Sequence, residues 1–277
     1  MSDVIDLAVL AFPGIDPVIF QIGPLAVRWY ALAYIAGLIF ASWYMKRLVT
    51  NAALWGRVQP TMSVPQVDEF FIWSVLGVVL GGRLGYVLFY KPMHFLSHPL
   101  DVFKMWDGGM SFHGGFLGVV VACLIFGRSI GAGLDRMLDL GAASVPVGLG
   151  LGRIANFINA ELWGRPSEVP WAMVFPGDQL ALARHPSQLY EAVLEGLVLF
   201  VLVRIATHRF GALQFAGRAS GVFALWYGLA RIIAEFFREP DAHLGYFLGF
   251  ITMGMILSLP LCAIGIWLLL RSRRDAT

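Results

Sequence analysis

Charged residues are scarce in this chain of 277 residues. Asp, Glu, Lys and Arg together make up 14% of it and apolar types make up 58%, and the mean hydropathy is +0.72. Because a soluble domain usually carries about 25% charged residues, this composition predicts a protein that resides in a lipid bilayer. A net charge of only +2 offers no strongly basic surface, so we expect no nucleic-acid partner.

Cysteine is also nearly absent, and Cys123 and Cys262 both lie inside apolar runs. Two such residues exclude a disulfide framework and a CxxC-type metal cluster, and each is expected to be a small buried side chain. Residues 1–24 contain three acidic residues, no basic residue and no continuous apolar core. We therefore expect no cleavable signal peptide.

Long apolar runs, by contrast, recur along the whole chain. A membrane-spanning helix needs about 20 largely apolar residues, and seven segments meet this need: 25–45, 69–90, 111–130, 137–158, 186–206, 219–237 and 246–270. The segment 137–158 fits least well, because Asp135, Asp139, Pro146 and four glycines weaken it. The sequence predicts an all-α polytopic membrane protein with seven transmembrane helices in a single domain, 1–277.

The segments between these predicted helices define an orientation. One alternating set contains eleven basic residues, from Lys46 to Arg274, whereas the other contains five basic and ten acidic residues. Lys and Arg stay on the cytoplasmic side of a membrane, so we expect the N-terminus outside and the C-terminus in the cytoplasm. The loop region 159–185 then faces outward. Its aromatic side chains form either a lid or, as we favour, an interfacial belt.

Three predicted helices carry glycines at every fourth position. They are Gly77, Gly81 and Gly85; Gly114 and Gly118; and Gly148 and Gly152. Small residues at this spacing allow two helix backbones to approach closely. We interpret all three stripes as helix-packing surfaces.

Several charged residues fall within or at the edge of the predicted helices: Arg28, Glu69, Arg83, Asp139, Arg153, Glu191, Glu195, Arg231 and Glu235. Glu69 and Asp139 lie near helix ends, where a side chain can reach the membrane interface. The others need a partner or a wet cavity, because a charge at the bilayer centre costs at least about 2.5–3.5 kcal/mol.

Helical spacing groups these residues into three stripes: Tyr227, Arg231 and Glu235; Ser187, Glu191 and Glu195; and Arg153 with Asn156. Glu191 and Glu195 would repel each other if both were ionised. Either one is protonated, or both face arginines of neighbouring helices. The arginines form ion pairs within the protein or bind an anionic guest. We favour the guest for the whole set, because guanidinium donors match phosphate oxygens.

A histidine with space around it is the candidate for proton transfer. His113 lies in "SFHGG" at the outer start of the third predicted helix, where two glycines leave room for a substrate. It shares the outer half of the bilayer with Asn156 and Glu161, and a neutral imidazole can accept a proton. His185, in "RHPSQLYE", is either functional or structural.

Five stretches together resemble a known family. "GGRLGYVLFY" (81–90), "WDGGMSFHGG" (106–115), "GRIANFINAELWG" (152–164), "RHPSQLYE" (184–191) and "RIIAEFFREPD" (231–241) are similar to the motifs of the prolipoprotein diacylglyceryl transferase family. The resemblance runs from about residue 16 to the seventh predicted helix, which is nearly the whole chain. Ala155 stands where the family pattern has glycine, and the 159–185 loop is shorter than in some relatives.

The resemblance implies a seven-helix bundle in the bacterial cytoplasmic (inner) membrane, with its active site toward the outer leaflet. The implied reaction transfers diacylglyceryl from phosphatidylglycerol to the lipobox cysteine of a preprolipoprotein, and it releases glycerol 1-phosphate. The partners are therefore phosphatidylglycerol, the signal-peptide and lipobox region of the preprolipoprotein, and the lipid bilayer. The reaction needs no metal and no cofactor.

Matching positions imply roles for individual residues. Arg153 and Arg231 are assigned to the leaving phosphate, which gains negative charge, and His113 to removal of the thiol proton. The residues expected to bind the substrate or to orient a residue that does are Tyr30, Arg83, Asn156, Glu161, Glu191, Tyr227 and Glu235.

Two other classes of membrane protein can also contain buried charges. A transporter or flippase would favour repeat symmetry and polar groups at the midplane and at both mouths, whereas the odd number of predicted helices and the one-sided polar groups argue against it. A structural subunit would leave three buried arginines without a purpose. The enzyme is the reading that we favour.

Overall fold

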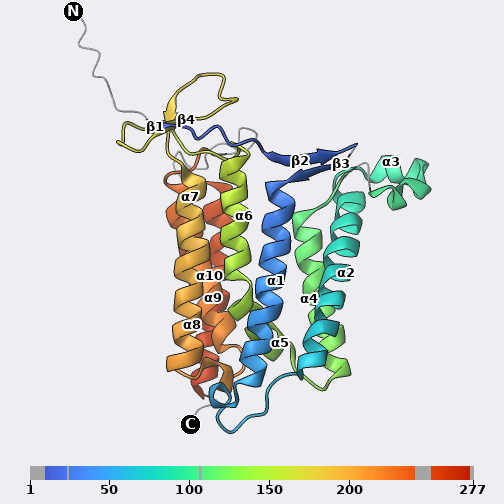
Figure 1. Ribbon diagram of the computed structural model, residues 1–277. Coiled ribbons are helices and arrows are strands. Elements are labelled where there is room, and N and C mark those ends of the chain that lie inside the picture. The colour runs from blue at the N-terminus through green and yellow to red at the C-terminus, as the bar shows by residue number, and fades with distance from the viewer. Residues whose placement is uncertain (1–9, 24, 106–107, 241–250, 275–277) are drawn as a thin grey trace, which may run out of the picture.

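The computed structural model describes residues 10–23, 25–105, 108–240 and 251–274. Its long helices stand side by side, and short strands, loops and a small helix cover one end of the bundle (Figure 1). The helices are α1 (Trp29–Thr50), α2 (Val64–Phe89), α3 (Pro92–Ser97), α4 (Phe112–Ser129), α5 (Leu134–Ser144), α6 (Pro146–Ile158), α7 (Ser187–Glu191), α8 (Leu199–Arg209), α9 (Arg218–Glu235) and α10 (Met253–Arg274). A π-helical segment, Ala192–Val198, joins α7 to α8.

In the part of the chain that the structure describes, five short strands lie at the covered end of the bundle. β1 (Leu10–Ala11) pairs in parallel with β4 (Met173–Val174), which pairs antiparallel with β5 (Ala183–Arg184). β2 (Val18–Ile22) and β3 (Leu25–Arg28) form a hairpin that leads directly into α1. The N-terminal segment and the 159–185 loop are therefore joined above the helices.

Among the described residues, four helices are long and apolar enough to cross a membrane, namely α1, α2, α4 and α10. A fifth span results if α5 and α6 are taken together, since they meet at a 47° bend. Pro146 begins α6 and lacks the N–H that would continue the hydrogen-bond ladder, which accounts for this bend. The predicted helical membrane fold is thus confirmed, while the count of seven spans stays a prediction.

The two remaining predicted spans are helical but less regular or more polar. Residues 187–209 are helical throughout, with the π-helical segment in the middle. Helix α9 contains Arg218, Arg231 and Glu235 within its 18 residues. The last predicted span, 246–270, begins outside the described residues, because 241–250 are not described.

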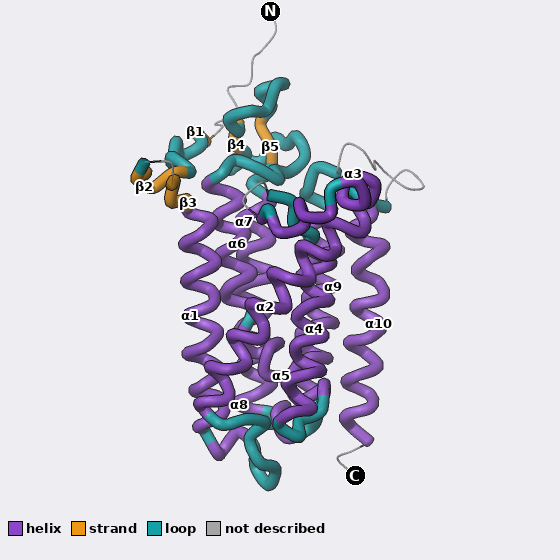
Figure 2. Tube along the Cα trace, turned by 90° about the vertical axis from the view of Figure 1, so that its right-hand side faces the viewer, coloured by secondary structure: helices purple, strands orange, loops and turns teal. Residues whose placement is uncertain are grey.

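The described connecting segments alternate between the two ends of the bundle. Residues 51–63, 130–133 and 210–217 lie at one end, which we call the basic end, and the strands, α3 and the 159–185 loop lie at the other (Figures 1 and 2). The main apolar cluster includes Leu48, Trp55, Val67, Phe126 and Leu140. Its α1 and α2 members come from the turns of those helices next to the basic end, so this half of the bundle is densely packed.

Asp139 differs from the sequence prediction. Its side chain is not at the interface, because the residue is only 1% exposed. Its carboxylate accepts hydrogen bonds from the backbone N–H groups of Gly217 and Ser220, at 2.7 and 2.8 Å. These groups lie at the start of α9, where unpaired N–H donors and the positive end of the helix dipole favour an acid. Asp139 therefore fixes α9 to α5.

Glycine stripes join α2 to α4, as predicted. A Cβ atom added at Gly81 or Gly114 would overlap the backbone oxygen of the other residue, and one added at Gly118 would overlap the oxygen of Gly77. Gly148 of α6 lies against Gly37 of α1, because a Cβ atom added at Gly148 would lie 3.5 Å from the Cα of Gly37. Gly152 is different, since an added Cβ there would meet nothing within 4 Å, so its predicted packing role is wrong.

Gly118→Ala should therefore destabilise the protein, whereas Gly152→Ala should not. Overpacking at Gly118 is expected to cost about 1–3 kcal/mol, while alanine at Gly152 improves helix propensity by up to about 1 kcal/mol. Thermal unfolding of the two variants in detergent measures the difference. An unchanged melting temperature for Gly118→Ala would show that α2 and α4 are not in backbone contact.

Candidate active site

A fully buried carboxylate lies at the centre of the polar residues in the bundle. Glu191 ends α7 and Glu195 lies one turn later in the π-helical segment, and their side chains are 0% and 1% exposed. Charges buried this completely in a membrane protein require partners. Arginines from two neighbouring elements supply them.

Arg153, near the end of α6, contacts both glutamates. Its Nη1 lies 3.1 Å from Oε2 of Glu191, and its Nε and Nη2 lie 3.0 and 2.9 Å from Oε2 of Glu195. Arg153 therefore joins α6 to the α7–α8 helix. Close backbone packing of Gly150 against Gly196, with an added Cβ only 3.1 Å from the Gly196 Cα, brings these two elements together.

Arg231 on α9 contacts Glu191 from the other side. Its Nη1 lies 2.5 Å from Oε1 of Glu191, and its Nη2 lies 2.5 Å from Oε1 of Glu235, one turn further along α9. Nη1 of Arg238, just beyond α9, also reaches Oε1 of Glu191, at 3.3 Å. We call Arg153, Glu191, Glu195, Arg231, Glu235 and Arg238 the Arg–Glu cluster.

The Arg–Glu cluster resolves one alternative that the sequence leaves open. Both Glu191 and Glu195 face arginines of neighbouring elements, which is the second of the two arrangements that the sequence allows. The geometry also shows ion pairs between arginines and glutamates of the protein itself. The sequence offers such pairs as the alternative to a bound anionic ligand. The cluster contains three arginines and three glutamates, and its formal charges balance.

The arginines nevertheless remain accessible. The side chains of Arg153 and Arg231 are 18% and 17% exposed, in contrast to the buried glutamates. Each Nη of Arg153 carries a second hydrogen, and Nε–H of Arg231 has no partner in the described part of the chain. Tyr227, one turn before Arg231, lies within electrostatic range of both guanidinium groups. Hydrogen-bond donors that can bind a further anion therefore lie close together at this point.

A second polar group lies next to Arg153 on α6. The side-chain amide of Asn156 donates to Tyr30 Oη at 2.6 Å and to Glu161 Oε1 at 2.7 Å. Tyr30 comes from the first turn of α1 and stacks on Tyr34, with ring centroids 5.5 Å apart. Three sequence-predicted residues are thus in direct contact, at the end of the bundle that the strands cover.

The 159–185 loop is fixed to the end of α9. Arg165 donates from Nη2 to the backbone oxygen of Glu235 at 2.8 Å and from Nε to that of Arg238 at 2.9 Å. Such contacts satisfy carbonyls that a helix end leaves unpaired. Gly164 is held so closely that an added Cβ would overlap the backbone oxygen of Phe237. The loop therefore packs beside the Arg–Glu cluster.

A salt bridge closes the loop on itself. Nε of Arg184 lies 2.6 Å from Oδ2 of Asp178, and both side chains are buried. The hydrogen bond from Arg184 lowers the pKa of Asp178, and the N–H groups of Leu180 and Leu182 lower it further. The carboxylate therefore stays ionised at neutral pH. His185 is held by Tyr190 Oη, at 3.0 Å from its Nδ1, and by ring contacts with Tyr190 and Phe237, so its contacts are structural.

Arg83 lies apart from the Arg–Glu cluster. It donates five hydrogen bonds, to the backbone oxygens of Asp101, Val102, Lys104, Gly108 and Gly109. A guanidinium has five N–H groups, so none remains for a lipid headgroup, and the prediction that Arg83 binds substrate does not fit. Arg83 instead holds the segment that leads to His113.

His113 is exposed in the first turn of α4, and the start of α4 lies at the same end of the bundle as the end of α6, which carries Asn156 (Figure 1). Its ring contacts Phe112, with centroids 5.7 Å apart. Among the described residues it forms no hydrogen bond or ion pair. The structure therefore brings Arg153, Glu191, Tyr227, Arg231 and Glu235 together, while His113 stays separate from them.

Comparison with known proteins assigns this arrangement to a family. The family model described as prolipoprotein diacylglyceryl transferase matches residues 17–271. Proteins of Brucella anthropi and Brucella canis named phosphatidylglycerol–prolipoprotein diacylglyceryl transferase are 55% identical over 268 residues, which is 96% of this chain and 95% of theirs. A protein of the same name from Brucella ovis is 54% identical over the same length. This chain belongs to the prolipoprotein diacylglyceryl transferase family.

Two members of the Arg–Glu cluster were not among the predicted site residues of this family member. Glu195 follows Glu191 by four residues, so the helical stripe already indicated it. Arg238 lies seven residues after Arg231, which is two helical turns on the same face. The helical pattern does not indicate it, because the predicted helix ends at residue 237. Arg165 and Arg184 lie in a loop and belong to no helical repeat in the sequence. Their partners are brought to them by loop contacts, which no periodicity indicates.

Glu191→Gln should destabilise the protein strongly. It removes the one carboxylate that Arg153, Arg231 and Arg238 share, and breaking a buried pair typically costs about 3–5 kcal/mol. The melting temperature in detergent measures this effect. Glu168→Gln is the matched control, because Glu168 is exposed, and this variant should melt like the wild type. Equal melting temperatures for both variants would contradict a structural role for Glu191.

Proposed function

We propose that this chain transfers the diacylglyceryl group of phosphatidylglycerol to the thiol of the lipobox cysteine of a preprolipoprotein. One observation carries the proposal: the Glu191 carboxylate holds Arg153 and Arg231 on its two oxygens, at 3.1 and 2.5 Å, and both arginines keep accessible donors. Two guanidinium groups fixed side by side form a site for a phosphate group. The family membership of the chain supports the same reaction.

We propose further that the chain crosses the bacterial inner membrane seven times, with the N-terminus outside and the C-terminus in the cytoplasm. The eleven basic residues of one loop set against five in the other support this orientation. The Arg–Glu cluster then lies toward the outer leaflet. The whole chain acts as one domain, and the 159–185 loop faces outward.

The reaction exchanges one bond at the glycerol carbon of the lipid. The cysteine sulfur forms a carbon–sulfur bond, while the carbon–oxygen bond to the phosphate breaks and glycerol 1-phosphate leaves. The leaving phosphate gains negative charge, so donors aimed at it lower the barrier. Arg153 and Arg231 supply these donors, and Glu235 and Glu191 hold them in place.

The neighbouring polar residues fit the headgroup of the lipid. Asn156 presents its amide between Tyr30 and Glu161, and these three side chains offer donors and acceptors to the hydroxyl groups of a glycerol. The Tyr227 hydroxyl lies beside the arginines and can donate to a phosphate oxygen. No step requires a metal or a cofactor in this scheme.

The thiol proton needs an acceptor, because the thiolate is the nucleophile and a free cysteine has a pKa of about 8.5. His113 is our candidate. Its exposure and its place at the same end of the bundle support this role. The segment held by Arg83 sets the position of the α4 start, so Arg83 acts on the reaction through His113.

Purified protein incubated with phosphatidylglycerol and a lipobox peptide should add a diacylglyceryl group to the peptide cysteine. Arg231→Lys should reduce this transfer at least about 100-fold, because an ammonium cannot replace two guanidinium contacts at once. Mass spectrometry of the peptide measures the product. Arg209→Lys, at the basic end, is the control and should transfer normally.

Two outcomes would contradict this proposal. Movement of phosphatidylglycerol across the membrane with no change in peptide mass would indicate a transporter. Normal transfer by a folded Arg231→Lys variant would remove Arg231 from the mechanism while leaving the reaction itself intact.

His113→Asn should slow transfer by about 100-fold or more if the imidazole accepts the thiol proton. The defect should shrink as the pH rises, because a growing fraction of the thiol ionises without help. Transfer rates of both proteins from pH 6 to 9 test this. A defect of constant size across that range would exclude His113 as the base.

A further inference from the structure

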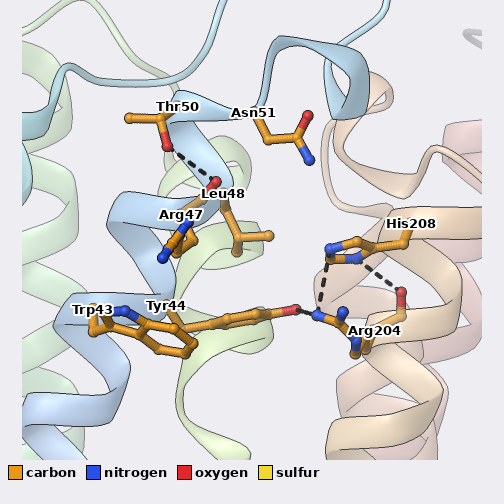
Figure 3. Close-up of a pocket in the computed structure, with 8 residues that line it drawn as sticks. All are labelled: Trp43, Tyr44, Arg47, Leu48, Thr50, Asn51, Arg204 and His208. Atoms are coloured by element: carbon orange, nitrogen blue, oxygen red, sulfur yellow. Dashed lines mark hydrogen bonds between the residues drawn. The ribbon is translucent and has the colours of Figure 1, made fainter.

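A polar hollow lies at the basic end of the bundle, far along the helices from the Arg–Glu cluster. It is lined by Trp43, Tyr44, Arg47, Leu48, Thr50 and Asn51 of the α1 end and by Arg204 and His208 of α8, and its volume is about 560 Å³. This size lies within the range of small-ligand sites, about 300–1,000 Å³. Figure 3 shows α1 on one side and α8 on the other.

The hollow contains two guanidinium groups and no acid. None of its described lining residues is Asp or Glu, and neither Arg47 nor Arg204 has an ion pair in the described part of the chain. This is the opposite of the Arg–Glu cluster, where carboxylates balance every arginine. The unbalanced charge is therefore available to an anion.

Aromatic rings hold the arginines in place. Nη1 of Arg204 donates to Tyr44 Oη at 3.2 Å and lies 3.5 Å from Nε2 of His208. The ring of His208 stacks on that of Tyr44, with centroids 6.4 Å apart, as the ring of Tyr44 reaches across from α1 (Figure 3). Arg47 lies over the ring of Trp43, at 5.7 Å. These contacts reduce the conformational freedom that binding would otherwise remove.

Neutralising helix dipoles does not account for this arrangement. Arg47 lies in the last turn of α1, where a cation stabilises the helix dipole by about 0.3–1 kcal/mol, but Arg204 lies in the middle of α8, beyond the last turn where this effect acts. That effect needs one exposed cation at each helix end. It needs neither an aromatic wall nor a shared space between the two guanidinium groups.

We infer that this hollow binds a phosphate-bearing ligand, and that the headgroup of an anionic phospholipid in the leaflet at this end is its occupant. Basic pockets between transmembrane helices bind such headgroups, and guanidinium donors match phosphate oxygens. Trp43, which is 51% exposed, has the amphipathic ring that favours the membrane interface. The bound lipid would join α1, which carries Tyr30 at its other end, to the helix that carries Glu191.

Quenching of Trp43 fluorescence separates this site from the reaction site. Full-length protein is placed in mixed micelles with phosphatidic acid brominated near the headgroup end of its acyl chains. The signal from the hollow is the quenching that Trp43→Phe abolishes. Brominated phosphatidylcholine, which has no net charge, should require a much higher concentration for the same quenching.

The double variant Arg47→Gln/Arg204→Gln should raise the half-saturating concentration of phosphatidic acid roughly 30-fold. This follows from about 1 kcal/mol for each basic residue near an anionic surface. The matched control is Arg57→Gln/Arg209→Gln, which removes two charges from the same end outside the hollow. It should stay within about twofold of the wild type. Far-UV circular dichroism in detergent, unchanged in both variants, shows that they are folded.

Each outcome decides the inference. Equal loss in the two double variants, or equal quenching by phosphatidic acid and phosphatidylcholine in the wild type, would overturn it. Loss confined to Arg47→Gln/Arg204→Gln would support it. If millimolar inorganic phosphate then displaces the lipid, the site is confirmed but its ligand is free phosphate. These results are independent of the transfer reaction, since none uses the lipobox peptide.

Discussion

The structure depends on the burial of two carboxylates inside a membrane protein. Glu191 and Glu195 have almost no exposed surface, and a charge in this environment requires ionic partners. Arg153 from α6 and Arg231 from α9 provide the pairing, so three helical elements are held in one arrangement. The glutamates thus determine where the guanidinium groups lie. In the reaction that we propose, a phosphate meets donors that the glutamates already orient, so little reorganisation is needed.

This arrangement also accounts for the density of loop contacts above it. The 159–185 loop satisfies the last carbonyls of α9 through Arg165, and Gly164 allows its backbone to lie against Phe237. Both contacts fix the end of the helix that carries Arg231 and Glu235. The membrane-facing surfaces, by contrast, consist of exposed apolar side chains such as Ile72, Leu80 and Leu88 on α2. Polar interactions therefore determine where the site residues lie, and the apolar surface determines that the protein resides in a membrane.

Sequence periodicity predicts which residues share a helix face, and it succeeded for Tyr227, Arg231 and Glu235. Periodicity cannot predict which face of another helix lies opposite. The sequence therefore offered an ion pair of Arg153 with a glutamate as only one of two alternatives, the other being an anionic ligand. Arg83 shows the limit more clearly. Its five acceptors are backbone oxygens of a loop, and no side-chain pattern marks a carbonyl. The same holds for Asp139, whose partners are N–H groups at the start of α9, and for the glycines, where only coordinates separate Gly148 from Gly152.

The dense apolar packing around Trp55, Phe126 and Leu140 in the basic half of the bundle bears on ion leakage along the helices. Protons and small ions need a continuous file of water or polar groups to pass between compartments. Apolar side chains packed against one another offer no such file. The described apolar cluster therefore opposes the passage of ions between its members.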